Sequence, residues 1–146
     1  MSSRDIRPVV LGVVWRDDEL LVGRGYDPGT DESFWRPLGG GIEFGEHSEE
    51  AVCREFDEEL GVEVAHTEFI THIENRFTFD GTQYHEIVFL YEADIADETV
   101  YEQDVMTGYE EAIDEEFEVR WIPVSSFESR DRTLYPEAIV DVVSKN

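Results

Sequence analysis

Cysteine, lysine and long apolar runs are all scarce in this chain of 146 residues. Cys53 is the only cysteine, so no disulfide can form within the chain. The first residues lack the apolar core of a secretory leader, and together with the single cysteine this favours a cytoplasmic location. No apolar run approaches the roughly 18 residues of a membrane span, so we expect neither a transmembrane helix nor a membrane partner.

Positive charge is also scarce. The chain has 11 basic and 36 acidic residues, so its formal net charge is −25 and its isoelectric point is near 4.2. Lys145 is the only lysine among the 11 basic residues. Such a surface is typical of a halophilic protein, and we expect folding to need roughly molar salt, at which the Debye length falls to about 3 Å. Equal thermal stability in low salt and in molar KCl would contradict this. The charge also disfavours nucleic-acid polymers, which need a basic surface.

The length and a hydrophobic content of 40% predict one domain over residues 1–146 with its own core. Strand-like runs lie on both sides of one central helix, and a second helix ends the chain. This order predicts an α/β fold, a mixed sheet with helices on both faces. Strands are predicted at 7–15, 19–24, 62–73, 76–79, 84–93 and 117–122, helices at 48–60 and 134–145, and loops at 25–33 and 94–114.

The stretch 40–62, GGIEFGEHSEEAVCREFDEELGV, combines a glycine-rich turn, a strand-like piece at 42–44, an acidic helix and a glycine stop. On a helical wheel Glu55, Glu58 and Glu59 share one face. Their mutual repulsion needs compensation, and Mg²⁺ or Mn²⁺ supplies it well, since these ions prefer carboxylate oxygens. From spacing alone, a solvated acidic face explains the pattern equally well.

The spacing in this stretch is more specific than its charge. Five residues separate Gly40 from Glu46, and seven more precede the pair Arg54-Glu55. The order resembles the Nudix box, the signature of the Nudix hydrolase (MutT-like) family, and every fixed position is filled: Gly40, Glu46, Arg54, Glu55, Glu58, Glu59 and Gly61. His47 stands where the family commonly has a helix-capping residue, so Ser48 is expected to cap instead. The resemblance implies an α/β/α Nudix sandwich.

The resemblance also implies roles for the box residues. Glu58 and Glu59 would be metal ligands, and Glu55 would be a ligand or the group that orients the attacking water. The backbone carbonyl of Gly39 would join them, and Arg54 would orient Glu55 through a salt bridge. The implied catalytic set is therefore Arg54, Glu55, Glu58 and Glu59, and the implied metal set, for Mg²⁺ or Mn²⁺, is Gly39, Glu55, Glu58 and Glu59.

The activity implied by the resemblance is a Mg²⁺-dependent pyrophosphohydrolase that cleaves a nucleoside diphosphate linked to another moiety. The family often adds a carboxylate from a distal loop, for which Glu110, Glu111 and Glu115 are equal candidates. A homodimer is a further expectation, since family members are often dimers. The alternative is a catalytically silent Nudix-fold module that binds a nucleotide, although such modules usually lose box carboxylates and this chain retains them.

Substrate recognition has weaker signals. Arg24, Arg36 and Arg76 are candidates for phosphate contacts, although each alone also suits a surface ion pair. Aromatic side chains could stack on a base or fill the core, and the candidates are Phe34, Trp35, Phe44, Phe77, Phe79 and Tyr84.

Overall fold

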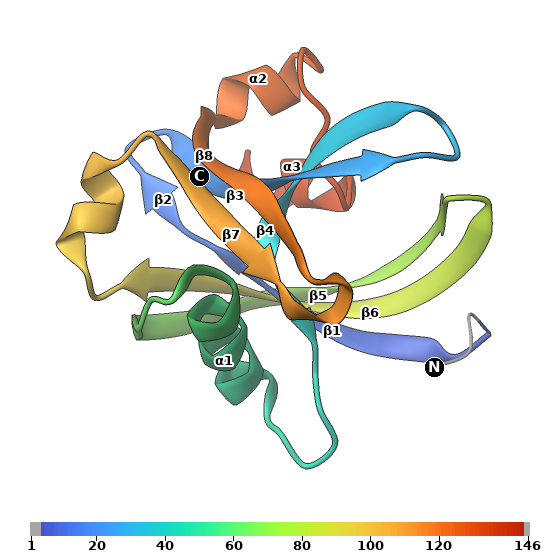
Figure 1. The fold of residues 1–146 in the computed structure, drawn as a ribbon, viewed down its shortest axis with the longest axis horizontal. Coiled ribbons are helices and arrows are strands. Elements are labelled where there is room, and N and C mark those ends of the chain that lie inside the picture. Colours follow the sequence, from blue (N-terminus) through green and yellow to red (C-terminus); the bar gives the residue numbers. More distant parts are fainter. Residues whose placement is uncertain (1–3, 145–146) are drawn as a thin grey trace.

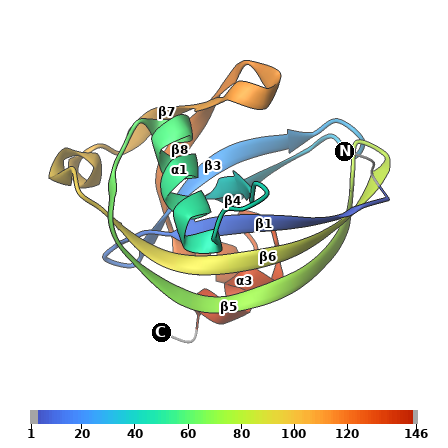
Figure 2. The same ribbon diagram turned by 90° about the horizontal axis from the view of Figure 1, so that it is seen from below.

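A curved mixed sheet lies between helices in the computed structural model, which describes residues 4–144 (Figure 1). The helix α1 (Ser48–Leu60) packs on one face of the sheet. The shorter helices α2 (Val124–Glu128) and α3 (Ala138–Val143) pack on the other. Figure 2 shows α1 in front of the sheet and α3 behind it. The predicted fold class, an α/β mixed sheet with helices on both faces, is confirmed.

The sheet has the strand order β5-β6-β1-β4-β3-β8-β7, with β2 paired to β3. Only the β1–β6 pair among these is parallel. The strands are β1 (Ile6–Val13), β2 (Trp15–Arg16), β3 (Glu19–Asp27), β4 (Glu32–Gly41), β5 (Val64–Phe79), β6 (Thr82–Ile95), β7 (Val105–Glu110) and β8 (Glu115–Pro123), and two short 3-10 helices are η1 (Glu98–Glu102) and η2 (Glu111–Ile113).

The strand β1 is buried on both faces from Val9 onwards, which explains its unbroken apolar run. Val10 faces the core under α1, whereas Val9 and Leu11 face the core under α2 and α3. Gly12 gives α1 its close approach, because a Cβ placed there would lie 2.6 Å from the ring of Phe56. The sheet and α1 therefore fit together through one missing side chain.

The helix α1 has the bounds predicted for it. Gly61 ends it in the left-handed conformation, with φ of 67°. The capping prediction was wrong, since the N-cap is His47, whose backbone N–H donates to Glu50 at 2.9 Å. Ser48 is instead the first helical residue, and its hydroxyl bonds that of Tyr91 at 2.6 Å.

Strand boundaries differ from the prediction in three places. The predicted strand at 42–44 is irregular, and β4 ends just before it at Gly41. Pairing between β3 and β4 extends through 25–27 and 32–33, which were assigned to a loop from their Gly, Pro and Asp content. The loop predicted at 94–114 contains β7, which is paired only with β8 at the sheet edge. An edge strand needs no continuous apolar run, so its pattern was weak.

The C-terminal region also differs from its prediction. The helix α3 begins at Ala138, later than predicted, and Lys145 lies outside the described residues. The helix α2 was missed because five residues are too few for a periodic signal. A two-residue turn at Asp80-Gly81 joins β5 to β6, with φ of 49° and 76°. No described helix is long and apolar enough to cross a membrane.

Candidate functional site

The glycine-rich end of β4 lies directly against α1. Gly39 has φ of 151°, and a Cβ there would lie 2.0 Å from the carbonyl oxygen of Val10. A Cβ on Gly40 would lie 2.7 Å from the carboxylate of Glu55. Both positions therefore require glycine, the first for its conformation and the second because a carboxylate occupies the space.

Glu55 and Glu59 are buried next to this backbone, with 9% and 7% of their surface exposed. The Gly39 N–H donates to Glu59 Oε2 at 3.2 Å. The carboxyl groups of Glu55 and Glu59 also lie close enough to influence each other's pKa.

Burial and like charge explain how this pair titrates. Burial raises the pKa of Glu59 to about 9, and the charges of Glu55 and Glu110 act in the same direction, while Arg36 lowers it. Burial also raises the pKa of Glu55, although a hydrogen bond from Arg54 partly offsets this. The site thus disfavours two negative charges unless a positive group enters it.

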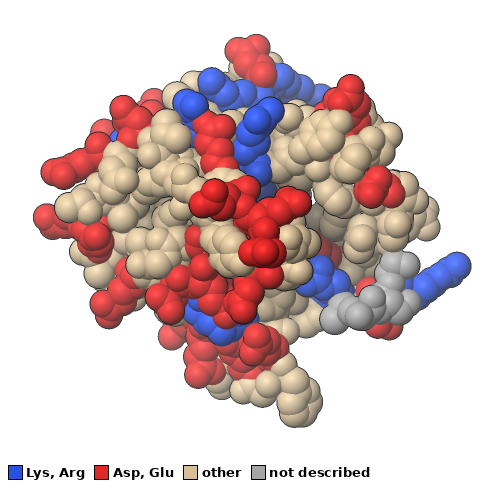
Figure 3. All heavy atoms as spheres, in the orientation of Figure 1, with Lys and Arg blue, Asp and Glu red and all other residues tan. Residues whose placement is uncertain are grey.

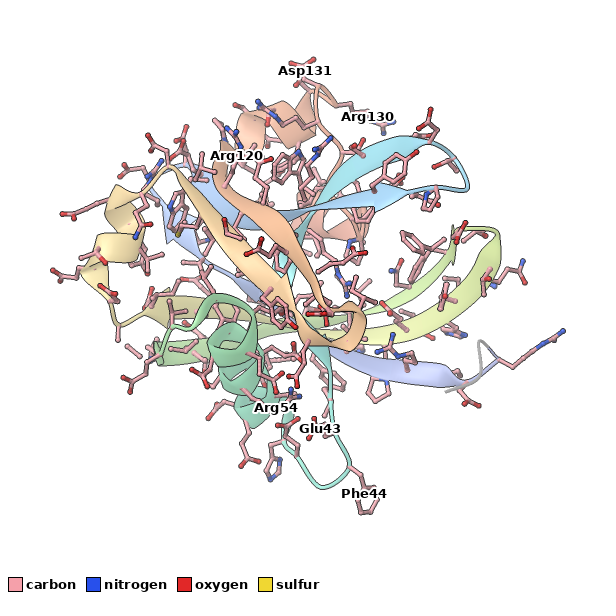
Figure 4. All side chains as sticks on the ribbon, viewed as in Figure 1. Glu43, Phe44, Arg54, Arg120, Arg130 and Asp131 are labelled. Atoms are coloured by element: carbon pink, nitrogen blue, oxygen red, sulfur yellow. The ribbon has the colours of Figure 1, made fainter. Side chains whose placement is uncertain are left out.

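Arg54 is fully used by its neighbours. Its Nε and Nη2 donate to the two carboxylate oxygens of Glu46 at 2.7 and 2.9 Å. Its Nη1 donates to Glu55 and to Glu58, each at 3.0 Å, and Nη2 also reaches the carbonyl of Gly41 at 2.9 Å. This network ties the turn to α1 and contains the expected contact between Arg54 and Glu55. Figure 4 shows Arg54 at the base of α1, beside Glu43.

Glu58 is not gathered with the other two box carboxylates. Its side chain is 38% exposed and is paired with Arg54. Within residues 4–144, no three His, Cys, Asp or Glu side chains are already grouped closely enough to hold a metal ion. The structure therefore brings together Gly39, Glu55 and Glu59 from the predicted set, whereas Glu58 is paired with Arg54.

A cavity of about 810 Å³ opens beside Glu59. Its walls come from β3, β4 and the β7–β8 region, and Gly39 and Glu59 lie among the lining residues. Arginines line part of it and carboxylates another part, including Arg24, Arg36, Glu110 and Glu115. Figure 3 shows acidic side chains over much of this face, with basic ones in a band towards its upper part. The cavity is large enough for a nucleotide-sized ligand.

The three candidates for the distal carboxylate differ in their positions relative to the cavity. Glu110 lines the cavity, and its charge contributes to the raised pKa of Glu59. Glu115 lines the cavity without appearing among the causes of that shift, and Glu111 is not among the lining residues. Of the three candidates, Glu110 alone combines both observations.

Some of the candidates for substrate recognition line the cavity and others do not. Arg24, Arg36, Phe34 and Phe79 line the cavity, whereas Arg76 does not. Phe44 is fully exposed on the loop before α1, where it points away from the protein (Figure 4). The other aromatic candidates pack elsewhere, with Trp35 against the core under α3 and Phe77 stacked on Tyr84.

Phe117 lines the cavity but was missed at the sequence level. Its ring occupies the space beside Gly23 and Gly108 on the two neighbouring strands, where a Cβ would lie 2.7 and 2.5 Å from ring atoms. Glycines on both flanking strands could have indicated that an aromatic ring lies flat across them. That inference needs the strand pairing, which the sequence does not give.

The chain is similar to known proteins over most of its length. A family model described as NUDIX domain matches residues 5–140. The NAD-capped RNA hydrolase NudC of Pseudomonas aeruginosa is 40% identical over 65 residues, which are 44% of this chain and 23% of that protein. The matched segment thus spans about a quarter of that relative.

Two solved structures illustrate the fold similarity. A MutT protein from Bacillus halodurans superposes with a TM-score of 0.67 at 20% identity, covering 97% of this chain and 84% of the other. An ADP compounds hydrolase superposes with a TM-score of 0.64 at 24% identity, covering 94% of this chain and 69% of the other. At these identities the similarity establishes the fold.

Proposed function

The chain belongs to the Nudix family, and on that basis we propose that it hydrolyses the diphosphate bond of a nucleoside diphosphate linked to another moiety, with the help of a divalent cation. The observation that carries this proposal is the buried pair Glu55 and Glu59, of which Glu59 lines the cavity. The names of two similar proteins, an NAD-capped RNA hydrolase and an ADP compounds hydrolase, support a nucleotide-type substrate.

The donor set fits a magnesium or manganese ion. Glu55 and Glu59 offer carboxylate oxygens that repel each other when both are ionised, and a divalent cation would offset that repulsion. The remaining proposed donors are the carbonyl of Gly39 and the carboxylate of Glu58, which would have to leave Arg54. When bound, the ion would neutralise charge on the diphosphate and lower the pKa of a water.

The chain's own groups would orient the reaction. Arg54 holds Glu55 in place through its Nη1, so that the Glu55 carboxylate stays in the space that a side chain on Gly40 would otherwise occupy. Glu110 of β7 is the proposed distal acid, since it lines the cavity together with Glu59 and its charge acts on Glu59. It would accept a proton from the attacking water.

The test is a product screen in molar KCl with and without Mg²⁺, with reaction products separated by chromatography. The panel would contain nucleoside diphosphate sugars, ADP-ribose, NAD, dinucleoside polyphosphates, and normal and oxidised dNTPs. We expect Mg²⁺-dependent cleavage of a diphosphate bond in at least one of them. Cleavage of none by protein shown to be folded in that salt would favour the alternative, a silent nucleotide-binding module.

A further inference from the structure

A second cluster of arginine and glutamate lies outside the box. Glu86 on β6 has a side chain that is only 6% exposed. Arg7 of β1 approaches its Oε2 at 3.6 Å through Nη1, and Arg36 of β4 approaches its Oε1 at 3.9 Å through Nη2. One buried carboxylate is therefore faced by two guanidinium groups from two other strands, which leaves an excess of one positive charge.

Arg36 belongs to this cluster, but its N–H donors are not engaged there in hydrogen bonds. Its contact with Glu86 is longer than a hydrogen bond, and within the described part of the chain its guanidinium donates no hydrogen bond. A guanidinium carries five N–H donors, which all remain available to a ligand. The Arg36 side chain is also 37% exposed, so a ligand in solution can reach it.

The cavity is where those donors are available. Arg36 lines it together with Glu59. The other side of the cavity carries Glu110, Glu115, Glu116 and Glu118. An anionic ligand in such a cavity needs a local positive group, and a planar guanidinium matches the oxygens of a phosphate.

We propose that Arg36 binds a phosphate of the substrate beside the metal carboxylates, and that Glu86, backed by Arg7, is the positioning residue that holds Arg36 there. This deepens the proposed function and rests on it for the nature of the ligand. Glu86 sets the direction of Arg36 by charge, and Arg7 compensates the buried carboxylate, so that Arg36 is not drawn into a closed ion pair.

A purely structural role makes a different prediction. If Glu86 only joined β1, β4 and β6, its loss would lower thermal stability and leave ligand affinity unchanged. The positioning role predicts that Glu86 affects the ligand only through Arg36, so the effects of changing both residues should not add.

The experiment measures ADP and AMP binding by calorimetry, in buffer with Mg²⁺ at a salt concentration where circular dichroism shows every variant folded. Arg36→Met should weaken ADP binding about tenfold, and Glu86→Gln about threefold to tenfold. The Arg36→Met/Glu86→Gln double variant should match Arg36→Met alone. Arg36→Lys should recover part of the affinity, because it restores the charge without the fork. AMP should lose less than ADP in each variant.

Glu92→Gln is the matched control, because Glu92 is an exposed glutamate on the same strand. Its ADP affinity should equal that of the unmodified protein. Unchanged affinity in Glu86→Gln, fully additive losses in the double variant, or no ADP binding by the folded unmodified protein would each overturn the proposal. ADP binding without cleavage of any panel substrate would instead overturn the proposed enzyme function and leave the Arg36 site standing.

Discussion

Arg54 and Arg36 lie near the same glycine-rich end of β4, but their surroundings differ. Arg54 donates five hydrogen bonds, to three glutamates and one carbonyl. Arg36 faces Glu86 at 3.9 Å and donates none within the described residues. The first arginine is a fixed part of the structure, and the second is presented to a cavity. Both arginines face glutamates. The number of hydrogen bonds that each donates distinguishes the arginine that holds the structure together from the one that is available to a ligand.

The glutamates show the same contrast. Two hydrogen bonds from Arg54 help to lower the pKa of Glu46, whose charge is thereby satisfied. Burial raises the pKa of Glu59 to about 9, and the nearby charges of Glu55 and Glu110 add to this. Glu46 is therefore suited to holding the turn, whereas Glu59 is suited to receiving a cation.

The largest effect should come from removing the charge of Glu59. We expect Glu59→Gln to reduce turnover of the substrate found in the screen by about 1000-fold, equivalent to about 4 kcal/mol of transition-state stabilisation. Steady-state kinetics with Mg²⁺ would measure this. Glu49→Gln, an exposed change on the same helix, should keep full turnover. Turnover within threefold of normal in Glu59→Gln would remove its proposed role.

A glycine substitution tests the contact between β4 and Glu55. In Gly40→Ala the new Cβ would lie 2.7 Å from the Glu55 carboxylate, so that carboxylate must move. We expect turnover to fall about 100-fold, because small displacements of a catalytic group have effects of this size. Gly41→Ala is the control, since its Cβ would meet only the flexible end of Arg7, at 3.1 Å. Equal kinetics in the two variants would contradict the geometry.

Thermal stability should separate the two arginines. Arg54→Met leaves Glu46 and Glu55 without their main partner, and we expect a loss of about 2 kcal/mol, or about 6 °C in melting temperature. Arg36→Met breaks no hydrogen bond found in the structure and should change the melting temperature by less than about 2 °C. Differential scanning calorimetry with EDTA would measure both. A larger loss in Arg36→Met than in Arg54→Met would reverse the comparison.

The smallest effect concerns stability without metal. At pH 7 an unfolded Glu59, with its ordinary pKa near 4.5, is ionised, whereas the folded carboxyl with a pKa of about 9 must take up a proton. This uptake costs free energy at pH 7, and a neutral amide avoids it. Glu59→Gln should therefore melt about 3 °C higher than the unmodified protein in EDTA. A lower melting temperature in Glu59→Gln would show that burial of the Glu59 carboxyl does not destabilise the folded protein.

The sequence predicted the elements whose signals are local. The helix α1 and its stop at Gly61 both depend on a few adjacent residues. The strand β7 and the far end of β3 depend on pairing with distant strands, so composition misassigned them.

The candidate site divides in the same way. The box residues lie within 23 positions and could be identified together. The contacts of Glu86 join it to Arg7 and Arg36, which precede it by 79 and 50 positions. No spacing pattern marks such a contact, and only the sheet order brings these residues together.

The most direct test of the contrast between the two arginines is one set of kinetic curves for Arg54→Met and Arg36→Met on the same substrate. In the proposed function Arg54 positions the group that orients the reaction, so its loss should lower kcat with a small change in KM. In the proposed role of Arg36 it binds a substrate phosphate, so its loss should raise KM about tenfold with kcat largely retained. If both variants changed the same parameter by the same factor, the two arginines would not have separate roles.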